Sequence, residues 1–182
     1  MSKSIHIPEP PLAKFLFSNT GFAWFWLIVR LYVGWQWLSA GWEKLGNPAW
    51  TGTQAGAAVA GFLNGALTKA AGAHPDVSGW YAAFIRDFAL PHAAAFSFLV
   101  TWGEIAIGVL LILGLFTGIA AFMGTFLNLN YLFAGTVSTN PLLLLLQLFL
   151  ILAWRTAGWF GFDRYMLAEL GTPWKEGKLF KA

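Results

Sequence analysis

Two charged residues within apolar stretches are the first candidates for chemistry in this sequence. Arg30 lies near the middle of the stretch 22–41, and Glu104 lies near the middle of the stretch 95–115. A charged side chain at the centre of a membrane helix costs about 2.5–3.5 kcal/mol on insertion scales, so it is expected to have a partner. Each of the two residues therefore predicts a buried polar interaction within an apolar helix bundle.

The two charges come to similar depths if the stretches are antiparallel membrane helices. Arg30 follows about eight residues of an outward-running helix, which places it about 12 Å deep at 1.5 Å per residue. Glu104 follows about nine residues of an inward-running helix and lies about 17 Å from the same edge of a ~30 Å core. The difference of about 5 Å is within the reach of an arginine side chain. The spacing predicts an Arg30–Glu104 ion pair.

Amide and aromatic side chains extend this candidate site. Trp37 and Asn128 each lie on the face of an apolar stretch that also carries small residues, and small residues allow close helix approach. Gln147 on the fourth stretch completes a set with Asn128. We expect these faces to point into a helix bundle. A buried Arg–Glu pair with amide neighbours is compatible with a functional site, and it is also compatible with a purely structural device that fixes helix register.

Glu43 and Lys44 end the first apolar stretch and are expected at the outer membrane surface. Lys44 could attract an anionic substrate there, although ordinary anchoring of a helix end by an interfacial lysine explains it as well.

Several classes of site are excluded or disfavoured by the sequence. It contains no cysteine, so disulfides and iron–sulfur clusters held by cysteine do not arise. Its three histidines have no helix-phased partner, which argues against haem and metal. No glycine-rich phosphate loop or dinucleotide fingerprint is present, and this argues against a flavin or nucleotide. The basic residues follow membrane topology instead of forming one patch, so nucleic acid is not an expected partner.

Composition and segment lengths predict an all-α integral membrane four-helix bundle. Hydrophobic residues make up 58% of the 182 residues and charged residues only 10%, far below the usual quarter. A helix needs about 20 residues to cross the hydrocarbon core, and four segments approach this length. One membrane domain, 22–157, is expected with the spans 22–41, 95–115, 118–136 and 141–157.

Charge distribution predicts the orientation of the chain. Seven Lys and Arg residues flank the spans in the terminal segments 1–21 and 155–182, against three in the connection 42–94. Basic residues favour the cytoplasmic side, so segments 1–21 and 158–182 are both expected there. The connection 42–94 carries two amphipathic helical patterns, which are expected to lie on the outer membrane surface as a cap.

The order and spacing of three motifs resemble the DoxX/DoxD family of small bacterial and archaeal membrane proteins. The motifs are AGWEKL at 40–45, GEIAIGVLLILGLFT at 103–117 and AGWFGFDR at 157–164. The long connection 42–94 is closer to the DoxD branch, the small membrane subunit of thiosulfate:quinone oxidoreductase. The resemblance implies a subunit in the bacterial or archaeal plasma membrane that passes electrons from a sulfur compound to quinone, usually beside a second subunit.

Two functional hypotheses follow from this resemblance and the polar residues. In the first, quinone is a bound substrate: Arg30 and Glu104 bind or protonate its carbonyl, while Asn128, Gln147 and Trp37 help to hold it. In the second, the chain is a non-catalytic accessory subunit of a larger respiratory or photosynthetic membrane complex. That hypothesis predicts a leucine-rich outer face over residues 142–150 that partner helices or pigments cover. Both hypotheses make the lipid bilayer and other membrane subunits the partners.

Overall fold

The computed structural model describes residues 8–172 and 175–180 and is almost entirely helical. Its two strands are two residues each and pair antiparallel, with Gly171 opposite Glu176. In chain order the elements are α1 (Pro11–Ser18), η1 (Thr20–Phe22), α2 (Ala23–Leu45), α3 (Pro48–Thr51), α4 (Ala57–Thr68), α5 (Gly79–Phe84), η2 (Ile85–Ala89), α6 (Ala93–Leu113), α7 (Thr117–Phe133), α8 (Asn140–Leu152), α9 (Trp154–Ala157), α10 (Asp163–Leu170), β1 (Gly171–Thr172), β2 (Lys175–Glu176) and η3 (Lys178–Phe180).

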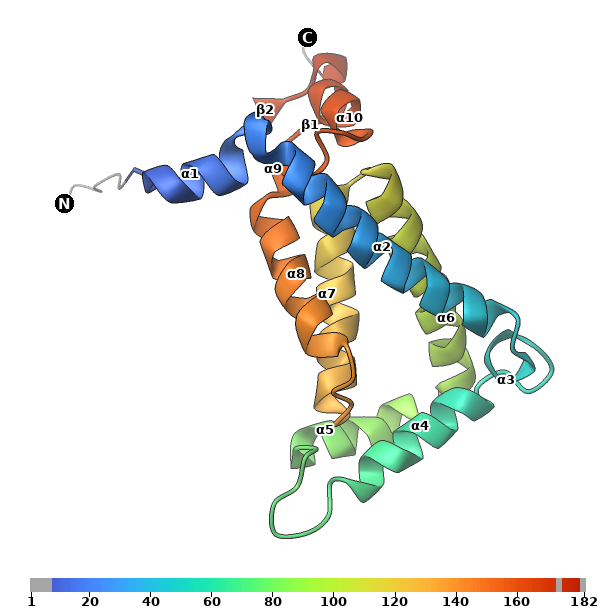
Figure 1. Cartoon of the computed structure of the whole chain (residues 1–182). Helices are drawn as coiled ribbons and strands as arrows, with labels where there is room; N and C mark the ends of the chain where they lie inside the picture. Colours follow the sequence, from blue (N-terminus) through green and yellow to red (C-terminus); the bar gives the residue numbers. More distant parts are fainter. Residues whose placement is uncertain (1–7, 173–174, 181–182) are drawn as a thin grey trace.

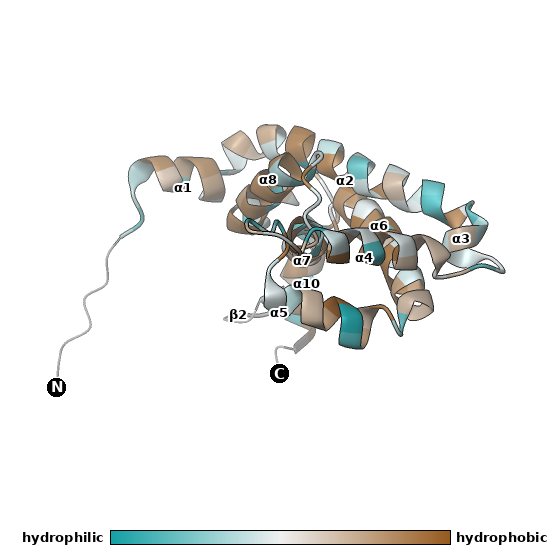
Figure 2. Ribbon diagram, turned by 90° about the horizontal axis from the view of Figure 1, so that it is seen from below, coloured by the Kyte–Doolittle hydropathy of each residue, from teal (hydrophilic) through white to brown (hydrophobic). Residues whose placement is uncertain are grey.

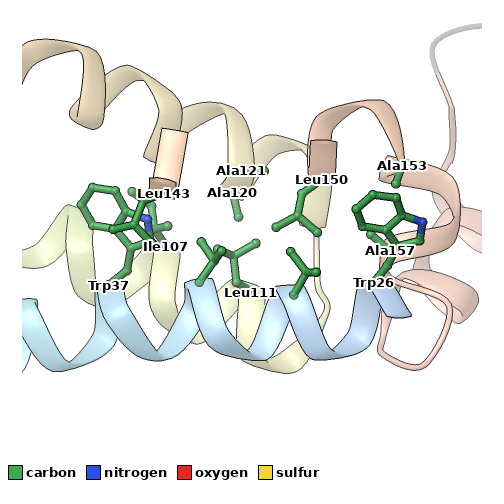
Figure 3. Close-up of a cluster of buried hydrophobic side chains, with 12 residues drawn as sticks. Trp26, Trp37, Ile107, Leu111, Ala120, Ala121, Leu143, Leu150, Ala153 and Ala157 are labelled. Atoms are coloured by element: carbon green, nitrogen blue, oxygen red, sulfur yellow. The ribbon is translucent and has the colours of Figure 1, made fainter. Parts of the chain in front are cut away.

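Four helices form the main body of the molecule. Helices α6 and α7 meet at a short turn and diverge from it, α8 returns along α7, and α2 packs mainly against α6 (Figure 1). Their shared core contains two tryptophans, Trp26 and Trp37, packed with aliphatic side chains (Figure 3). Burying such large apolar groups is the main favourable term for helix association in water, and close packing takes over that role in lipid.

Glycine residues bring α2 and α6 into close contact. A Cβ atom on Gly108 would lie 2.7 Å from Leu38 Cα, and one on Gly34 would lie 3.1 Å from Gly108 O. A Cβ on Gly41 would meet Ile105 N at 2.9 Å. Because these contacts leave no space for side chains, the glycines determine which levels of the two helices lie side by side.

A second core closes the open end of the α6–α7 pair. Helices α4, α5 and η2 lie across the diverging ends (Figure 1) and bury an apolar cluster centred on Leu63, Val77, Tyr81 and Ile85. The predicted helical patterns in the connection 42–94 are thus confirmed as helices. Their apolar faces pack on each other and on α6 and α7, where they act as a cap.

The all-helical prediction is confirmed, while helix lengths support only part of the predicted span pattern. Among the described residues, α6 alone is long and apolar enough to cross a membrane, and α1 with η1 and α2 passes the same test as a pair bent by 60°. Helix α7 has 17 residues and α8 has 13. The predicted span 141–157 is interrupted after Leu152, because the chain turns at Ala153 before α9 begins.

The outer surfaces of the long helices are rich in large apolar side chains. Hydrophobic residues predominate along α2, α6 and α8 in Figure 2, while more hydrophilic positions occur in the cap helices and α3. The exposed side chains include Ile28 and Trp35 on α2, Leu99 on α6 and Phe122 on α7, which are all more than half exposed. Apolar surface of this extent is typical of a face covered by lipid or by another subunit.

Candidate functional site

Glu104 is the centre of the candidate site. It lies on α6 on a face with Ser97, Thr101 and Gly108, and it is only 1% exposed. One carboxylate oxygen, Oε2, lies 2.7 Å from Lys44 Nζ, and the other, Oε1, accepts a hydrogen bond of 2.7 Å from the Tyr131 hydroxyl. A buried carboxylate is tolerated when its oxygens are paired in this way.

Lys44 reaches Glu104 from the last turn of α2. Gly41, one turn earlier, allows α2 to approach the level of Glu104 and Ile105 closely. The Lys44 ammonium also lies 3.3 Å from Ala40 O and 5.1 Å from the centre of the Trp50 ring. Trp50 belongs to the short helix α3, which Pro48 and the Asn47 cap begin directly after α2. The cation is therefore held between a carboxylate and an aromatic face.

Tyr131 is held by aromatic neighbours on two sides. Its ring stacks on Trp37 with centroids 6.5 Å apart, and it meets the ring of Phe62 edge-on at 6.0 Å. Trp37 comes from α2 and Phe62 from α4, so Tyr131 links the main body to the cap. This packing orients its hydroxyl toward Glu104.

An apolar cavity of about 360 Å³ adjoins the Lys44–Glu104–Tyr131 group. It lies in the space between α6, α7 and the cap helices, where α6 and α7 diverge. Both Lys44 and Tyr131 line it, and Glu104 contacts both of them from behind this wall. The other lining residues are mainly apolar: Trp50, Val59, Phe62, Leu63, Phe84, Ala89, Phe96, Val100, Phe126 and Leu127, with the polar residues Tyr81, Asn130, Thr136 and Asn140.

Tyr81 comes from the cap and lines the cavity together with its hydrogen-bond partner Asn130. It donates to both Asn130 O and Asn130 Oδ1 at 3.0 Å. Burial raises the pKa of Tyr81 to about 12, because the phenolate would lose its hydration. The hydroxyl is therefore neutral at physiological pH.

Asn128, Gln147 and Trp37 form a buried network of their own. The amide groups of Asn128 and Gln147 meet at 2.6 Å. The Gln147 orientation that gives the Trp37 indole N–H an acceptor also lets Gln147 Nε2 donate to Leu143 O at 3.2 Å. Gly124 makes room for this amide, since a Cβ there would overlap the amide end of the Gln147 side chain. None of these three residues lines the cavity.

Arg30 lies in a different part of the molecule from Glu104. It is 1% exposed, and its Nη2 donates to Phe160 O at 3.1 Å. Its guanidinium occupies the space beside Gly114, where φ is +64°, and a Cβ on Gly114 would overlap Arg30 Nη1. Asp163 attracts it electrostatically and accepts hydrogen bonds from Phe116 N and Thr117 N at the start of α7.

The predicted Arg30–Glu104 pair is therefore wrong, and the reason is helix register. Gly41 lies at the level of Glu104, so Arg30 is 11 residues, or about 16 Å, further along α2. Helix α2 runs four residues past the predicted end at 41, and its other end packs on α9. The prediction estimated the depths of Arg30 and Glu104 by counting residues from the ends of the predicted spans. This count gave the wrong offset between α2 and α6.

Lys44, which the sequence places at the outer end of the first span, has an ion-pair partner that was not predicted. Its side chain is 19% exposed and is the partner of Glu104. Tyr131 was not predicted at all, although a sequence signal exists: it follows Asn128 by three residues and so shares a helix face with it. Asp163 was likewise not predicted as a site residue. The motif AGWFGFDR contains no partner for Asp163, whose hydrogen-bond donors come from the start of α7 in the folded chain.

The fold and site define an all-helical protein with apolar outer faces and a paired, buried carboxylate beside an apolar cavity. Residues 25–180 match the model of a protein family described as "TQO small subunit DoxD". Because the match covers most of the chain, the protein belongs to the DoxD family, as the motif resemblance predicted. No curated protein and no solved structure shows a significant match to the chain.

Among the described residues, no group of three or more His, Asp and Glu side chains could hold a metal ion. All the residues of the Lys44–Glu104–Tyr131 group, together with Arg30 and Asp163, lie within the range that matches the family.

Proposed function

We propose that this DoxD protein is the membrane subunit of a quinone-linked oxidoreductase, and that the cavity beside Lys44 and Tyr131 receives the quinone head group. The observation that carries the proposal is the position of Glu104. It is a buried carboxylate bonded to two groups that can carry protons, and both of these groups face an apolar cavity. Buried titratable groups next to such a cavity are the usual sign of a binding or reaction site.

The cavity suits a quinone in both size and lining. Its volume of about 360 Å³ falls within the range of small-molecule sites, and its walls are mostly aromatic and aliphatic. Aromatic side chains such as Phe62 and Trp50 provide flat surfaces for a flat ring. The Lys44 ammonium and the tyrosine hydroxyls supply a few directional polar contacts at the edge.

Quinone reduction requires two protons at the two carbonyl oxygens along with two electrons. In our proposal Lys44 donates a hydrogen bond to a carbonyl oxygen, and Glu104 holds Lys44 in place and exchanges protons with it. Tyr131 orients the Glu104 carboxylate through the bond to Oε1. A positioned acid–base group typically contributes about 10²- to 10⁴-fold to a rate. In this proposal Glu104 acts through Lys44 instead of directly on the carbonyl, and Lys44 takes the place that was predicted for Arg30.

The electrons would come from a partner subunit that oxidises a sulfur compound, with thiosulfate as the candidate suggested by the family's name. In the same proposal, α2, α6, α7 and the α8–α9 pair cross the plasma membrane, with both chain ends on the cytoplasmic side. The cap and the Lys44 end of α2 then lie toward the outer surface. The exposed apolar faces of the long helices are available to lipid and to the partner subunit.

Replacing Glu104 by Gln in the intact complex tests the proposal. We expect quinone-dependent turnover to fall about 100-fold or more, because the amide cannot exchange protons with Lys44. The matched control is Glu43→Gln, since Glu43 is exposed and lies next to Lys44 in the same motif. Steady-state turnover with a short-tailed quinone is the measurement. Unchanged turnover in a folded Glu104→Gln complex would show that this assignment is wrong.

The accessory-subunit alternative is favoured by one observation, the outer face of α8. Leu142, Leu145, Leu148 and Leu152 recur at helical spacing and are all at least 45% exposed. This is the leucine-rich face that the sequence predicts for contact with partner helices or pigments. Co-purification of a large membrane complex without bound quinone, and with normal turnover in Glu104→Gln, would favour this alternative.

A further inference from the structure

The direction of the hydrogen bonds around the cavity suggests which form of a ligand it prefers. Tyr81 is 5% exposed, and it lines the cavity from the cap. Its single hydroxyl proton is shared between Asn130 O and Asn130 Oδ1, both at 3.0 Å. Both partners are acceptors, so the proton is already used within the protein.

Asn130 does not return a hydrogen bond to Tyr81. Its Nδ2 donates to Phe126 O at 2.8 Å, and its backbone oxygen also accepts from Ala134 N at 3.0 Å. Within the described residues, no hydrogen bond is donated to the Tyr81 oxygen. This oxygen is therefore free to accept a hydrogen bond, and to donate one it would have to give up Asn130.

Tyr131, like Tyr81, uses its hydroxyl proton in a hydrogen bond within the protein. Its proton is directed to Glu104 Oε1, so its oxygen can also only accept from a ligand. The Lys44 ammonium is the charged donor on the wall, and Glu104 and Ala40 O already take part of its donor capacity. The tyrosines therefore provide two acceptor oxygens at a site whose main donor is largely engaged.

A quinone and a quinol differ in what they offer to such a wall. A quinone carries two carbonyl acceptors and no donor, whereas a quinol carries two hydroxyl protons. We infer that the cavity binds the dihydroxy form more tightly than the quinone, with Tyr81 accepting a hydrogen bond from one ligand hydroxyl. This inference rests on the proposed function, because it assumes that the cavity is a quinone site.

Equilibrium binding to the full-length protein in detergent, measured without oxygen, tests the inference. The probes are decylubiquinone and decylubiquinol, which differ only in redox form. We expect the unmodified protein to bind the quinol about five- to tenfold more tightly, as is typical for one added neutral hydrogen bond. In Tyr81→Phe, quinol affinity is expected to fall by about the same factor. Quinone affinity is expected to change less than about twofold in that variant.

Tyr32→Phe is the matched control, because Tyr32 lies on the outer face of α2 and does not line the cavity. Equal affinities of the two probes for the unmodified protein would overturn the inference and leave the proposed function standing. An equal loss for both probes in Tyr81→Phe would also overturn it, since Tyr81 would then act only through packing. Binding of neither probe would contradict the proposed function as well.

Discussion

At the scale of single residues, Lys44 is the group that makes the burial of the Glu104 carboxylate possible. Glu104 is buried in the body of the molecule, and the cation is the group that offsets the lost hydration of the carboxylate. The bond from Tyr131 adds to this but brings no charge. Removal of Lys44 leaves the Glu104 carboxylate buried without a counter-charge, whereas Lys44 without Glu104 would keep its contacts with Ala40 O and the Trp50 ring.

Lys44→Met should therefore destabilise the protein more than Lys44→Met combined with Glu104→Gln. Breaking a buried ion pair from one side costs on the order of 3 kcal/mol, whereas replacing both charges by neutral groups is often close to neutral. We expect the melting temperature in detergent to fall in the single variant and to recover largely in the double variant. A double variant as unstable as Lys44→Met alone would contradict the pairing.

At the scale of elements, the glycines between α2 and α6 decide which charges meet. Gly34, Gly41 and Gly108 allow the backbones to touch at defined levels, and these levels bring Lys44 to Glu104. The same contacts take Arg30 to the opposite end, where Gly114 and Gly161 surround its guanidinium. The offset between α2 and α6 along their axes therefore separates Arg30 from the Lys44–Glu104 pair.

Gly108→Ala should loosen this contact, because its Cβ would lie 2.7 Å from Leu38 Cα. Overpacking of this kind typically costs about 1–3 kcal/mol. Gly65→Ala in α4 is the control, since a Cβ there meets nothing within 4 Å. It should stabilise the helix by about 0.5–1 kcal/mol through reduced backbone entropy. Thermal unfolding of both variants checks the prediction, and a Gly108→Ala protein as stable as the unmodified protein would contradict it.

At the scale of the whole molecule, the cap lies at one end of the long helices, and α1 and α10 lie at the other end (Figure 1). The cap holds one wall of the cavity, so access to the cavity depends on which side of a membrane the cap occupies. The distribution of basic residues predicts that the chain ends are cytoplasmic. Under the proposed topology the Lys44 end of the cavity is then near the outer surface.

Single cysteines can test this orientation, because the protein has none of its own. Ala73→Cys lies at an exposed position of the cap, and Tyr165→Cys replaces an exposed residue of α10. In intact cells or spheroplasts, a membrane-impermeant maleimide should label Ala73→Cys. Tyr165→Cys should react only after the membrane is permeabilised. The opposite labelling pattern would show that the predicted orientation is wrong.

The sequence by itself determined the helical class, the family and the burial of four polar residues. Arg30, Glu104, Asn128 and Gln147 are all at most 1% exposed, because an apolar helix can satisfy such groups only inside a protein. These inferences depend on local composition and on periodicity within one helix. They do not depend on how one helix is placed against another.

Only the tertiary structure decided the partners of these residues. The long connection 42–94 permits many offsets between α2 and α6. Arg30 and Lys44 are 14 residues apart on α2, so this offset decides which of them meets Glu104. The cavity likewise arises because α6 and α7 diverge beneath the cap, and this brings Tyr81 and Tyr131 to one space. Packing between backbones sets these relations, and no single helix carries that information in its own sequence.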